Sequence, residues 1–405
     1  MEPHEGTVED VLSRGGDVSI IDLVDALVRQ AHLLRASDIH IDPTDSAVKV
    51  RVRIDGVLHE KFLLSKNIHS EIISRIKVLA WLRTDEHQAA QDGRFRIVGE
   101  GAVPIDVRVS ITPTYYGENA VLRLLIDLPE QHTLGSLGFS EEDQNKIFRT
   151  VRRSDGMVLA TGPTGSGKTT TLYTLIKLLN TKEVSIVTIE DPVEYAVNGI
   201  TQIQIQPKTG LTFATGLRSI LRQDPNIIMV GEIRDPETAG IAINTALTGH
   251  LLLSTLHTND SASTLPRLLD MGVDPYLVAS TVSLAIGQRL VRKICDNCKI
   301  AHILSESEYA SLSESISLGG LRESSFFIGK GCELCDNSGY LGRVGVNEVL
   351  VVDAQVREAI LTKASAAQIQ KVAVEKGMTP MLQDGLNKAR RGLTSVYELM
   401  RTMHE

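Results

Sequence analysis

The sequence has few aromatic residues and lacks any long apolar run. Aromatic side chains make up 4% of the 405 residues, whereas proteins that bind single-stranded nucleic acids usually stack bases on aromatic rings. A net charge of −8 also argues against a general nucleic-acid coat. No apolar stretch approaches the roughly 20 residues of a membrane-spanning helix, and residues 1–15 lack the core of a signal peptide. We therefore expect a cytoplasmic protein that does not bind nucleic acid and contacts membranes only peripherally, through partners.

Cysteine is also scarce, and the four cysteines form two close pairs. The chain reads Cys295-x-x-Cys298, then 33 residues, then Cys332-x-x-Cys335. Two such pairs bring four thiolates within tetrahedral reach, and a closed four-sulfur site is structural, with Zn²⁺ as the expected metal. The alternatives are a redox pair, an empty relic of a metal site, or a nucleic-acid zinc ribbon. Asp296, Glu333 and Asp336 make the surroundings poorly basic for a nucleic-acid ribbon.

The most informative stretch is residues 157–180, where an apolar run passes through a glycine-rich turn into a helical pattern. It matches G-x-x-x-x-G-K-[ST], the phosphate-binding loop of P-loop enzymes, with the strand and helix that this motif requires. Backbone N–H groups and the positive end of the helix dipole bind phosphate there. Lys168 is expected to neutralise the β- and γ-phosphates, and the Thr169 hydroxyl to hold Mg²⁺. The expected ATP-binding residues are Gly162, Pro163, Thr164, Gly165, Ser166, Gly167, Lys168, Thr169 and Thr170.

The N-terminal third of the chain alternates apolar and polar residues and carries many arginines. Around Asp55-Gly56 this alternation predicts a β-hairpin. Lys49, Arg51 and Arg53 then share one face of its first strand, because side chains alternate across a strand. A sheet with an arginine-bearing face is therefore expected.

The length of the chain and its changes of pattern predict several folding units. Short apolar runs that alternate with helical segments after residue 140 favour a largely parallel, buried sheet. The predicted divisions are a flexible lead-in (1–18), an α/β domain (19–127), a linker (128–140), a P-loop core (141–292), a four-cysteine metal module (293–342) and a helical C-terminal region (343–405).

Three further sequence boxes follow the phosphate-binding loop: TIEDPVEY (188–195), IIMVGEIRD (227–235) and TGHLLLSTLHTND (248–260). Other short motifs are SDIH (37–40), VRVRIDGVL (50–58), QDGRF (91–95) and VLRLL (121–125). Taken in this order with the paired cysteines, they resemble the type II secretion and type IV pilus assembly ATPase family, from about Ile20 to the C-terminus.

The resemblance implies a RecA-like P-loop NTPase domain with a smaller, PAS-like N-terminal α/β domain, a zinc module and a helical C-terminal region. It also implies a hexameric, Mg²⁺-dependent ATPase that drives pseudopilus or pilus assembly. The implied partners are an inner-membrane platform protein and a recruiting protein at the cytoplasmic face. Retraction motors of the related pilus branch generally lack the cysteines, so their presence favours secretion or pilus extension.

Acidic residues in two of the boxes are candidates for the hydrolytic chemistry. Glu232 follows a predicted strand, and a carboxylate at that edge faces the nucleotide, where it can orient or deprotonate the attacking water. Ordinary P-loop enzymes place an aspartate before this glutamate to help hold Mg²⁺, but Gly231 stands here, as in the family. The resemblance assigns Glu194 a role near Mg²⁺ and the water. Glu190 and Asp191 either join this cluster or form a helix cap or solvated turn.

Two histidines flank the predicted strand 251–256. Because they lie seven positions apart, one regular strand would point them to opposite faces. We expect His257, at the C-terminal end, to sense the γ-phosphate, with Ser254, Thr255 or Thr258 nearby. His250 is expected to be structural.

Arginines of the N-terminal sheet are candidates for arginine fingers. The resemblance points to Arg108 and Arg123, reaching the site of a neighbouring subunit, and Arg94 and Arg53 are secondary candidates. The alternative is that these arginines only solvate an exposed sheet face. Fingers that act in trans require a ring, so a homo-oligomer is expected.

Two other functions stay open at this point: an assembly scaffold that ATP stabilises with little turnover, and a nucleic-acid translocase or conjugation-type ATPase. Glu232 argues against the scaffold, and the acidic charge with few aromatics argues against the translocase. Long members of the family carry an additional N-terminal docking domain, and some 19 residues precede the first predicted helix here. The chain is either a piece of a longer protein or a short form.

Overall fold

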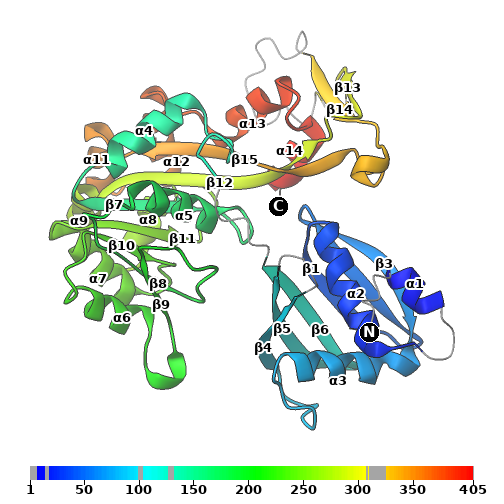
Figure 1. Cartoon of the computed structure of the whole chain (residues 1–405). Helices are drawn as coiled ribbons and strands as arrows, with labels where there is room; N and C mark the ends of the chain where they lie inside the picture. Colours follow the sequence, from blue (N-terminus) through cyan, green and yellow to red (C-terminus); the bar gives the residue numbers. More distant parts are fainter. Residues whose placement is uncertain are drawn as a thin grey trace. The chain divides into compact units, whose positions relative to one another are not determined.

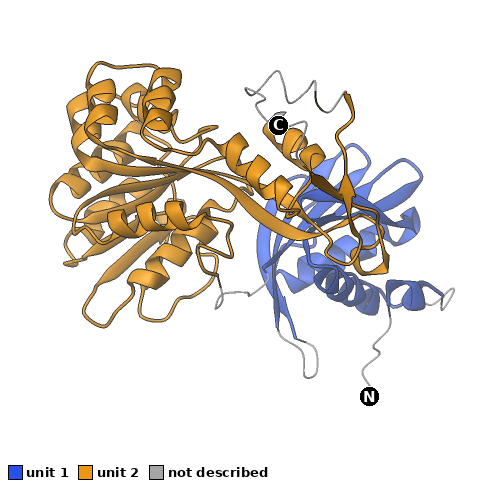
Figure 2. Ribbon diagram, turned by 90° about the horizontal axis from the view of Figure 1, so that it is seen from above, with its two compact units in different colours: residues 1–129 blue, residues 130–405 orange. Residues whose placement is uncertain are grey.

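The computed structural model describes residues 7–13, 18–98, 104–125, 132–306, 309 and 325–404. The chain divides into two compact units, residues 1–129 and 130–405, which are coloured separately in Figure 2 and described separately below. The division falls in the region of the predicted linker, 128–140, and residues 128–131 of that linker lie outside the described part.

The first unit is built on a six-stranded sheet with the order β3-β2-β1-β6-β5-β4, and each neighbouring pair is antiparallel. Its strands are β1 (Ala36–Pro43), β2 (Ala47–Ile54), β3 (Val57–Ser65), β4 (Gln91–Ile97), β5 (Ile105–Thr114) and β6 (Gly117–Leu125). Its helices are α1 (Val8–Ser13), α2 (Ile20–Leu33), η1 (Lys66–Ile68) and α3 (His69–Leu79). Residues of α2 and α3 form one apolar core with alternate residues of the strands.

The predicted hairpin and its two faces are confirmed. β2 and β3 pair from Ile54 and Val57 outward, and Asp55 and Gly56 between them have φ of 48° and 88°. Positive φ at both central residues is the geometry that an Asp-Gly turn favours. Val50 is fully buried in the core, whereas Arg51 beside it points to the other face.

The predicted flexible lead-in over residues 1–18 is wrong for its described part. Residues 8–13 form α1, and Val8 and Val11 are buried in the core of the first unit. The backbone N–H of Val8 donates to the side chain of Gln30 on α2 at 3.1 Å. A helix of six residues covers less than two turns, so its apolar residues do not form a periodic pattern that the sequence would reveal.

The second unit is built on a seven-stranded sheet with the order β15-β12-β7-β11-β10-β8-β9 (Figure 1). Its strands are β7 (Gly156–Thr161), β8 (Ile186–Glu190), β9 (Thr201–Gln204), β10 (Ile227–Val230), β11 (Leu251–Leu256), β12 (Val282–Ile294) and β15 (Tyr340–Val351). The helices before β12 are α4 (Glu141–Val151), α5 (Lys168–Leu179), η2 (Pro207–Thr209), α6 (Phe213–Ile220), α7 (Pro236–Leu247), α8 (Thr264–Asp270) and α9 (Pro275–Thr281).

The predicted parallel, buried sheet is confirmed. All neighbouring strands from β12 to β9 are parallel. In β7, an interior strand of the sheet, Met157 and Leu159 pack into one apolar core, and Val158 and Ala160 pack into another. Both faces of this strand are therefore covered, as in α/β proteins whose helices lie on both sides of the sheet.

The predicted boundaries of the cysteine module are wrong, because they cut two long strands. β12 and β15 pair in antiparallel fashion from Leu284 opposite Val351 to Ile294 opposite Tyr340. Figure 1 shows this pair running from the sheet toward the small two-stranded sheet of β13 (Lys299–His302) and β14 (Phe326–Gly329). The cysteines lie at the far end of the pair, so the module is an extension of the main sheet.

The C-terminal region is helical only after β15. The predicted helical region, 343–405, begins inside that strand, and four helices follow it. These helices are α11 (Ala354–Leu361), α12 (Ala366–Glu375), α13 (Met381–Arg390) and α14 (Val396–His404). Gly377 and Gly392 lie between helices with φ of 91° and 69°, the left-handed conformation that glycine adopts where a helix ends.

A buried carboxylate ties α14 to β12. Glu398 is 0% exposed and accepts hydrogen bonds from Arg292 Nη2 at 2.6 Å and from Arg401 Nε at 2.8 Å. Burial alone would raise the pKa of Glu398, but the hydrogen bonds and charges of the two guanidinium groups outweigh it and lower that pKa to about 2. The ion pair is therefore present at all ordinary pH values.

We predict that Glu398→Gln lowers the free energy of unfolding of the second unit by about 3 kcal/mol at pH 7, because it leaves a buried guanidinium without its counter-charge. The stabilisation by Glu398 is complete above the ordinary glutamate pKa of 4.5 and is lost as the pH falls through about 2. The difference between wild type and variant should therefore shrink below pH 4.5 in urea-unfolding curves.

A matched control is Glu237→Gln, which removes the exposed ion pair between Glu237 and Arg218. Exposed pairs contribute at most about 1 kcal/mol, so this variant should unfold like wild type. Equal unfolding midpoints for Glu398→Gln and wild type at pH 7 would contradict the role of the buried pair.

Candidate functional site

The glycine-rich loop connects β7 to α5, where the sequence predicts it. β7 ends at Thr161 and α5 begins at Lys168. A Cβ atom on Gly162 would lie 2.3 Å from the carbonyl oxygen of Gln288, so this position accepts only glycine. The buried Oγ of Ser166 has no hydrogen-bond partner among the described residues. A tight turn at a helix N-terminus with a spare buried hydroxyl fits a bound phosphate.

Lys168 lies inside this loop. Its Nζ donates to the carbonyl oxygens of Gly162 at 2.8 Å and Pro163 at 2.9 Å. Burial lowers the pKa of Lys168, and the negative charge of Glu232 acts in the opposite direction. The loop therefore holds its ammonium group within electrostatic reach of the carboxylate at the end of β10.

Glu232 and His257 lie side by side at one edge of the sheet. They follow the neighbouring parallel strands β10 and β11. Oε2 of Glu232 is 3.0 Å from Nε2 of His257 and 2.7 Å from Nε of Arg234. The carboxylate is 12% exposed, against 47% for the His257 side chain. The arrangement is a nearly buried carboxylate with a partly exposed imidazole beside it.

The remaining polar residues of β11 hold the strand in place. Ser254 Oγ donates to the carbonyl oxygen of Val230, and Thr255 Oγ1 donates to that of Gly231, both at 2.8 Å. Their hydroxyls thereby fix the end of β10 that precedes Glu232. His250 lies at the opposite end of β11, with Nδ1 3.2 Å from the carbonyl oxygen of Thr245. This position fits the structural role expected for His250.

The acidic box begins within β8, and its Glu190 is a buried carboxylate at the end of that strand, so the interpretation of Glu190 as part of a solvated turn is wrong. Glu190 is 2% exposed, and Oε1 accepts hydrogen bonds from Thr188 Oγ1 at 2.5 Å and from Gln202 Nε2 at 3.2 Å. Its Oε2 accepts a hydrogen bond from the hydroxyl of Tyr173. Burial raises the pKa of Glu190. Asp191, by contrast, is exposed.

Tyr173 links the phosphate-binding helix to the loop that carries Glu194. It lies on α5, one turn after Thr169, and burial raises the pKa of its hydroxyl. The backbone N–H of Glu194 donates to this hydroxyl at 3.3 Å. Sequence reasoning missed Tyr173, Thr188 and Gln202 because only their pairing in the folded sheet brings them together. The available signal was Thr188 inside an apolar strand.

Arginines form a row across the sheet of the first unit. Arg94, Arg108 and Arg123 are paired in register on β4, β5 and β6. Asp38 on β1 pairs with Arg123 on one side and with Arg53 of β2 on the other. Like charges directly opposite one another destabilise a sheet. Three neighbouring arginines therefore concentrate positive charge on this face of the sheet.

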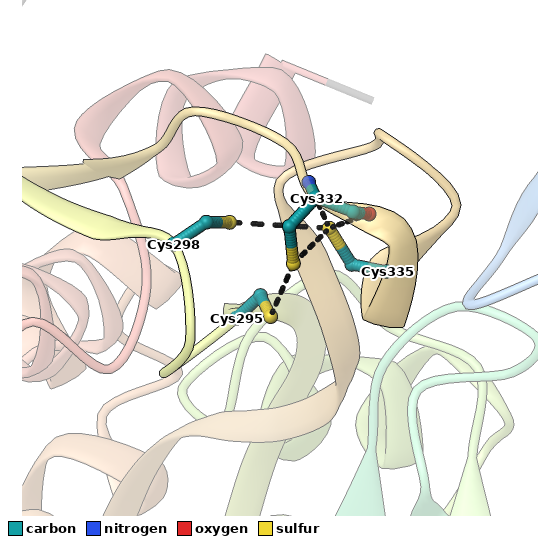
Figure 3. Close-up of side chains that lie close together, drawn as sticks. All are labelled: Cys295, Cys298, Cys332 and Cys335. Carbon is teal, nitrogen blue, oxygen red and sulfur yellow. Dashed lines mark hydrogen bonds between the residues drawn. The ribbon is translucent and has the colours of Figure 1, made fainter.

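The four cysteines converge, as the sequence predicts (Figure 3). Their Sγ atoms all lie within 4.8 Å of one another. The separations are 3.8 Å for Cys295 and Cys332, 3.9 Å for Cys298 and Cys335, and 3.7 Å for Cys332 and Cys335. Four sulfurs at the usual Zn–S distance of about 2.3 Å lie about 3.8 Å apart in a tetrahedron. The donor set therefore fits Zn²⁺.

Neighbouring N–H groups support the sulfurs. The side chain of Asn297 donates to Sγ of Cys332, and the backbone N–H of Gly339 donates to Sγ of Cys335, each at 3.3 Å. The hydrogen bond from Asn297, with those from the neighbouring cysteines, lowers the pKa of Cys332 to about 6. This donor favours the thiolate of Cys332, the form that binds metal, whereas burial raises the pKa of Cys298 to about 11.

Two named relatives are similar to this chain over almost all of its length. Type II secretion system protein E of Xanthomonas campestris is 44% identical over 403 residues, which are 98% of this chain and 70% of that protein. The type IV pilus assembly ATPase PilB of Thermus thermophilus is 44% identical over 385 residues, 93% of this chain and 42% of that protein. The chain thus spans less than half of the length of that relative.

Solved structures and a family description complete the comparison. The pilus retraction motor PilT with bound ADP has a TM-score of 0.64 and 26% identity, and covers 95% of this chain and 97% of its own. The Legionella pneumophila ATPase DotB, at 23% identity, shares the fold, with a TM-score of 0.69 over 98% of this chain and 96% of its own. Residues 13–401 match the family described as "Type II/IV secretion system protein". The chain therefore belongs to the type II/IV secretion system protein family.

Proposed function

We propose that this chain is a Mg²⁺-dependent ATPase that forms a hexameric ring and drives pseudopilus or pilus assembly in a type II secretion or type IV pilus system. The observation that carries the proposal is the edge of the second sheet, where Glu232 and His257 follow strands that run parallel beside the strand leading into the phosphate-binding loop. The relatives at 44% identity are named type II secretion system protein E and type IV pilus assembly ATPase, which supports the same activity.

The chain's own residues would divide the work of hydrolysis. Backbone N–H groups of the loop, residues 162–170, would hold the phosphates of ATP, with Lys168 neutralising their charge. Mg²⁺, when bound, supplies further positive charge at the phosphates, and the exposed Thr169 hydroxyl would hold it. Glu232 would orient the attacking water and accept its proton, and His257 beside it would sense the γ-phosphate. Glu194 would act near Mg²⁺ and the water.

Catalysis in this account is shared between subunits. Arg108 and Arg123 would meet the γ-phosphate in the site of a neighbouring subunit, where an arginine is worth about 10³- to 10⁵-fold in rate in related P-loop enzymes. The row of like charges on the first sheet supports this, because an incoming phosphate would relieve their repulsion. Because each subunit would need a neighbour's arginines to complete its site, the subunits would assemble into a closed ring.

The cellular setting is proposed on the same family grounds. The protein would work in the cytoplasm, held at the inner membrane by a platform protein and a recruiting protein. Across the parts of the chain that the structure describes, no helix has the length and apolarity needed to cross a membrane. Force would come from ATP-dependent rearrangement of the two units, because a ligand shifts a conformational equilibrium only by binding one state better.

The cysteine cluster would hold one structural Zn²⁺ at the end of the β12–β15 pair. The spacing of the sulfurs and the surrounding N–H donors support this assignment. Four protein ligands leave no position for a substrate, so the metal would fold the module and take no part in hydrolysis.

We predict that Glu232→Gln lowers ATP turnover about 100-fold or more, because the water loses its base. ATP binding and ring formation should persist, since the side chain keeps its size. Lys168→Ala should instead abolish ATP binding. The measurements are steady-state ATPase assays and equilibrium binding of a fluorescent ATP analogue, with Glu237→Gln on α7 as the matched control. Unchanged turnover in Glu232→Gln would favour a scaffold that ATP merely stabilises.

For the metal, we predict about one Zn²⁺ per chain in freshly purified protein. Replacing Cys332 with serine should remove the zinc and unfold the module, because metal affinity and local folding are coupled. ATP binding at the phosphate-binding loop should survive. The measurement is elemental analysis combined with ATP binding. Less than one Zn²⁺ per two chains in the wild-type protein would contradict the four-thiolate site.

A further inference from the structure

We propose that Asp38, in the SDIH motif of β1, is a positioning residue that holds the guanidinium of Arg123 in the orientation of an arginine finger. The inference rests on the proposed role of Arg123 in the neighbouring active site. It adds a named residue, on a different strand, that acts through Arg123 and never meets ATP itself.

Asp38 lies between two arginines on the arginine-bearing face of the first sheet. Its pairing partners are Arg53 on β2 and Arg123 on β6. Oδ1 is 2.9 Å from Nε of Arg123, and Oδ2 is 3.6 Å from Nε of Arg53. The hydroxyl of Ser37 donates to Oδ2 at 2.8 Å. Both carboxylate oxygens of Asp38 are therefore engaged, which fixes the plane of the carboxylate.

Burial makes this contact stronger than an ordinary surface ion pair. Asp38 is 5% exposed, although the side chain of Arg123 is 58% exposed. A buried carboxylate needs its partners, whereas an exposed pair contributes little. Nε of Arg123 is thus held by a buried carboxylate, while more than half of the Arg123 side chain is exposed to solvent. An arginine finger requires both features: a fixed Nε and an exposed guanidinium end that can reach a phosphate.

The contact with Asp38 does not use the edge of the Arg123 guanidinium that would bind a phosphate. Asp38 contacts Nε, the nitrogen next to the aliphatic part of the side chain. The edge formed by the two terminal Nη groups can bind a phosphate through two parallel hydrogen bonds. Asp38 therefore orients the group and does not use the edge that recognises the phosphate.

A second aspartate on the same sheet shows the contrasting arrangement. Asp106 gives both oxygens to one arginine, with Arg96 Nε at 2.9 Å from Oδ1 and Nη2 at 2.5 Å from Oδ2. This bidentate pair occupies two donors of a single guanidinium. Asp38 instead divides its oxygens between two arginines. The Asp106 pair is therefore structural, and it supplies a matched control.

Repulsion within the row explains why a positioning residue is needed. Arg123 is directly opposite Arg108, which is directly opposite Arg94. Without a carboxylate on its other side, Arg123 would be driven away from Arg108 toward solvent. Asp38 supplies the opposing attraction and keeps Arg123 within the row.

The test is a double-mutant cycle on the assembled ATPase, with Asp38→Asn, Arg123→Ala and the double variant. Asp38→Asn should lower kcat about 10- to 100-fold with little change in KM for ATP, since it misplaces a catalytic group without touching the nucleotide. In the Arg123→Ala background the same substitution should change kcat less than about twofold, because it has nothing left to position. Single-turnover assays measure the slow variants.

Two further variants separate positioning from structure. Ser37→Ala should give a smaller loss of kcat, because it removes only one support of the carboxylate, and it keeps the test decisive if Asp38→Asn folds poorly. Asp106→Asn should leave kcat unchanged, although it breaks an ion pair on the same sheet. Size-exclusion chromatography reports ring formation for each variant.

The outcomes distinguish failure of the proposed arginine finger from failure of the positioning role of Asp38. Wild-type kcat in Arg123→Ala would overturn the proposed finger and this inference with it. A strong loss in Arg123→Ala, with either wild-type kcat in Asp38→Asn or losses that multiply in the double variant, would overturn the positioning role alone. A fall in kcat for Asp106→Asn equal to that for Asp38→Asn would also reduce Asp38 to a structural residue.

Discussion

Parallel pairing of β7, β10 and β11 is the constraint on which the candidate site of the second unit depends. Because the carboxyl ends of parallel strands meet at one edge of a sheet, the loop after β7 and the residues after β10 and β11 are brought together. Glu232 and His257, 25 positions apart in the chain, are thereby placed in contact. Ser254 and Thr255 then hold the end of β10 through its carbonyl oxygens. The strand register therefore decides which of these groups lie close enough to act together.

The two units carry complementary charge patterns. The second unit has a loop built to bind phosphates and a nearly buried carboxylate beside it. The first unit has arginines in register with one another, and a further anion would lower the repulsion among them. The transition state of ATP hydrolysis needs positive charge around the phosphates, and the arginine row is a concentrated source of it. The proposal that neighbouring subunits share an active site accounts for both.

Sequence reasoning succeeded where the signal was local. The Asp55-Gly56 hairpin, the phosphate-binding loop and each Cys-x-x-Cys pair depend on residues within a few positions of one another, and the structure has all of them. Sequence reasoning failed where the structure depends on pairing between strands that are far apart in the chain. The strands β12 and β15 run past the predicted module boundaries because each is the other's partner. Burial of Glu190, and the placement of Asp38 between two arginines, likewise depend on sheet order, which periodicity does not reveal.

Shared catalysis is tested most directly by mixing two inactive variants. Arg123→Ala subunits keep Glu232 and Lys168, and Glu232→Gln subunits keep Arg123, so a mixed ring contains interfaces where one intact half meets the other. We predict that co-assembled rings recover ATP hydrolysis that neither variant shows alone, with a maximum at intermediate mixing ratios. No recovery at any ratio, in rings shown to contain both variants, would contradict the account and place the arginine and the glutamate in one chain's site.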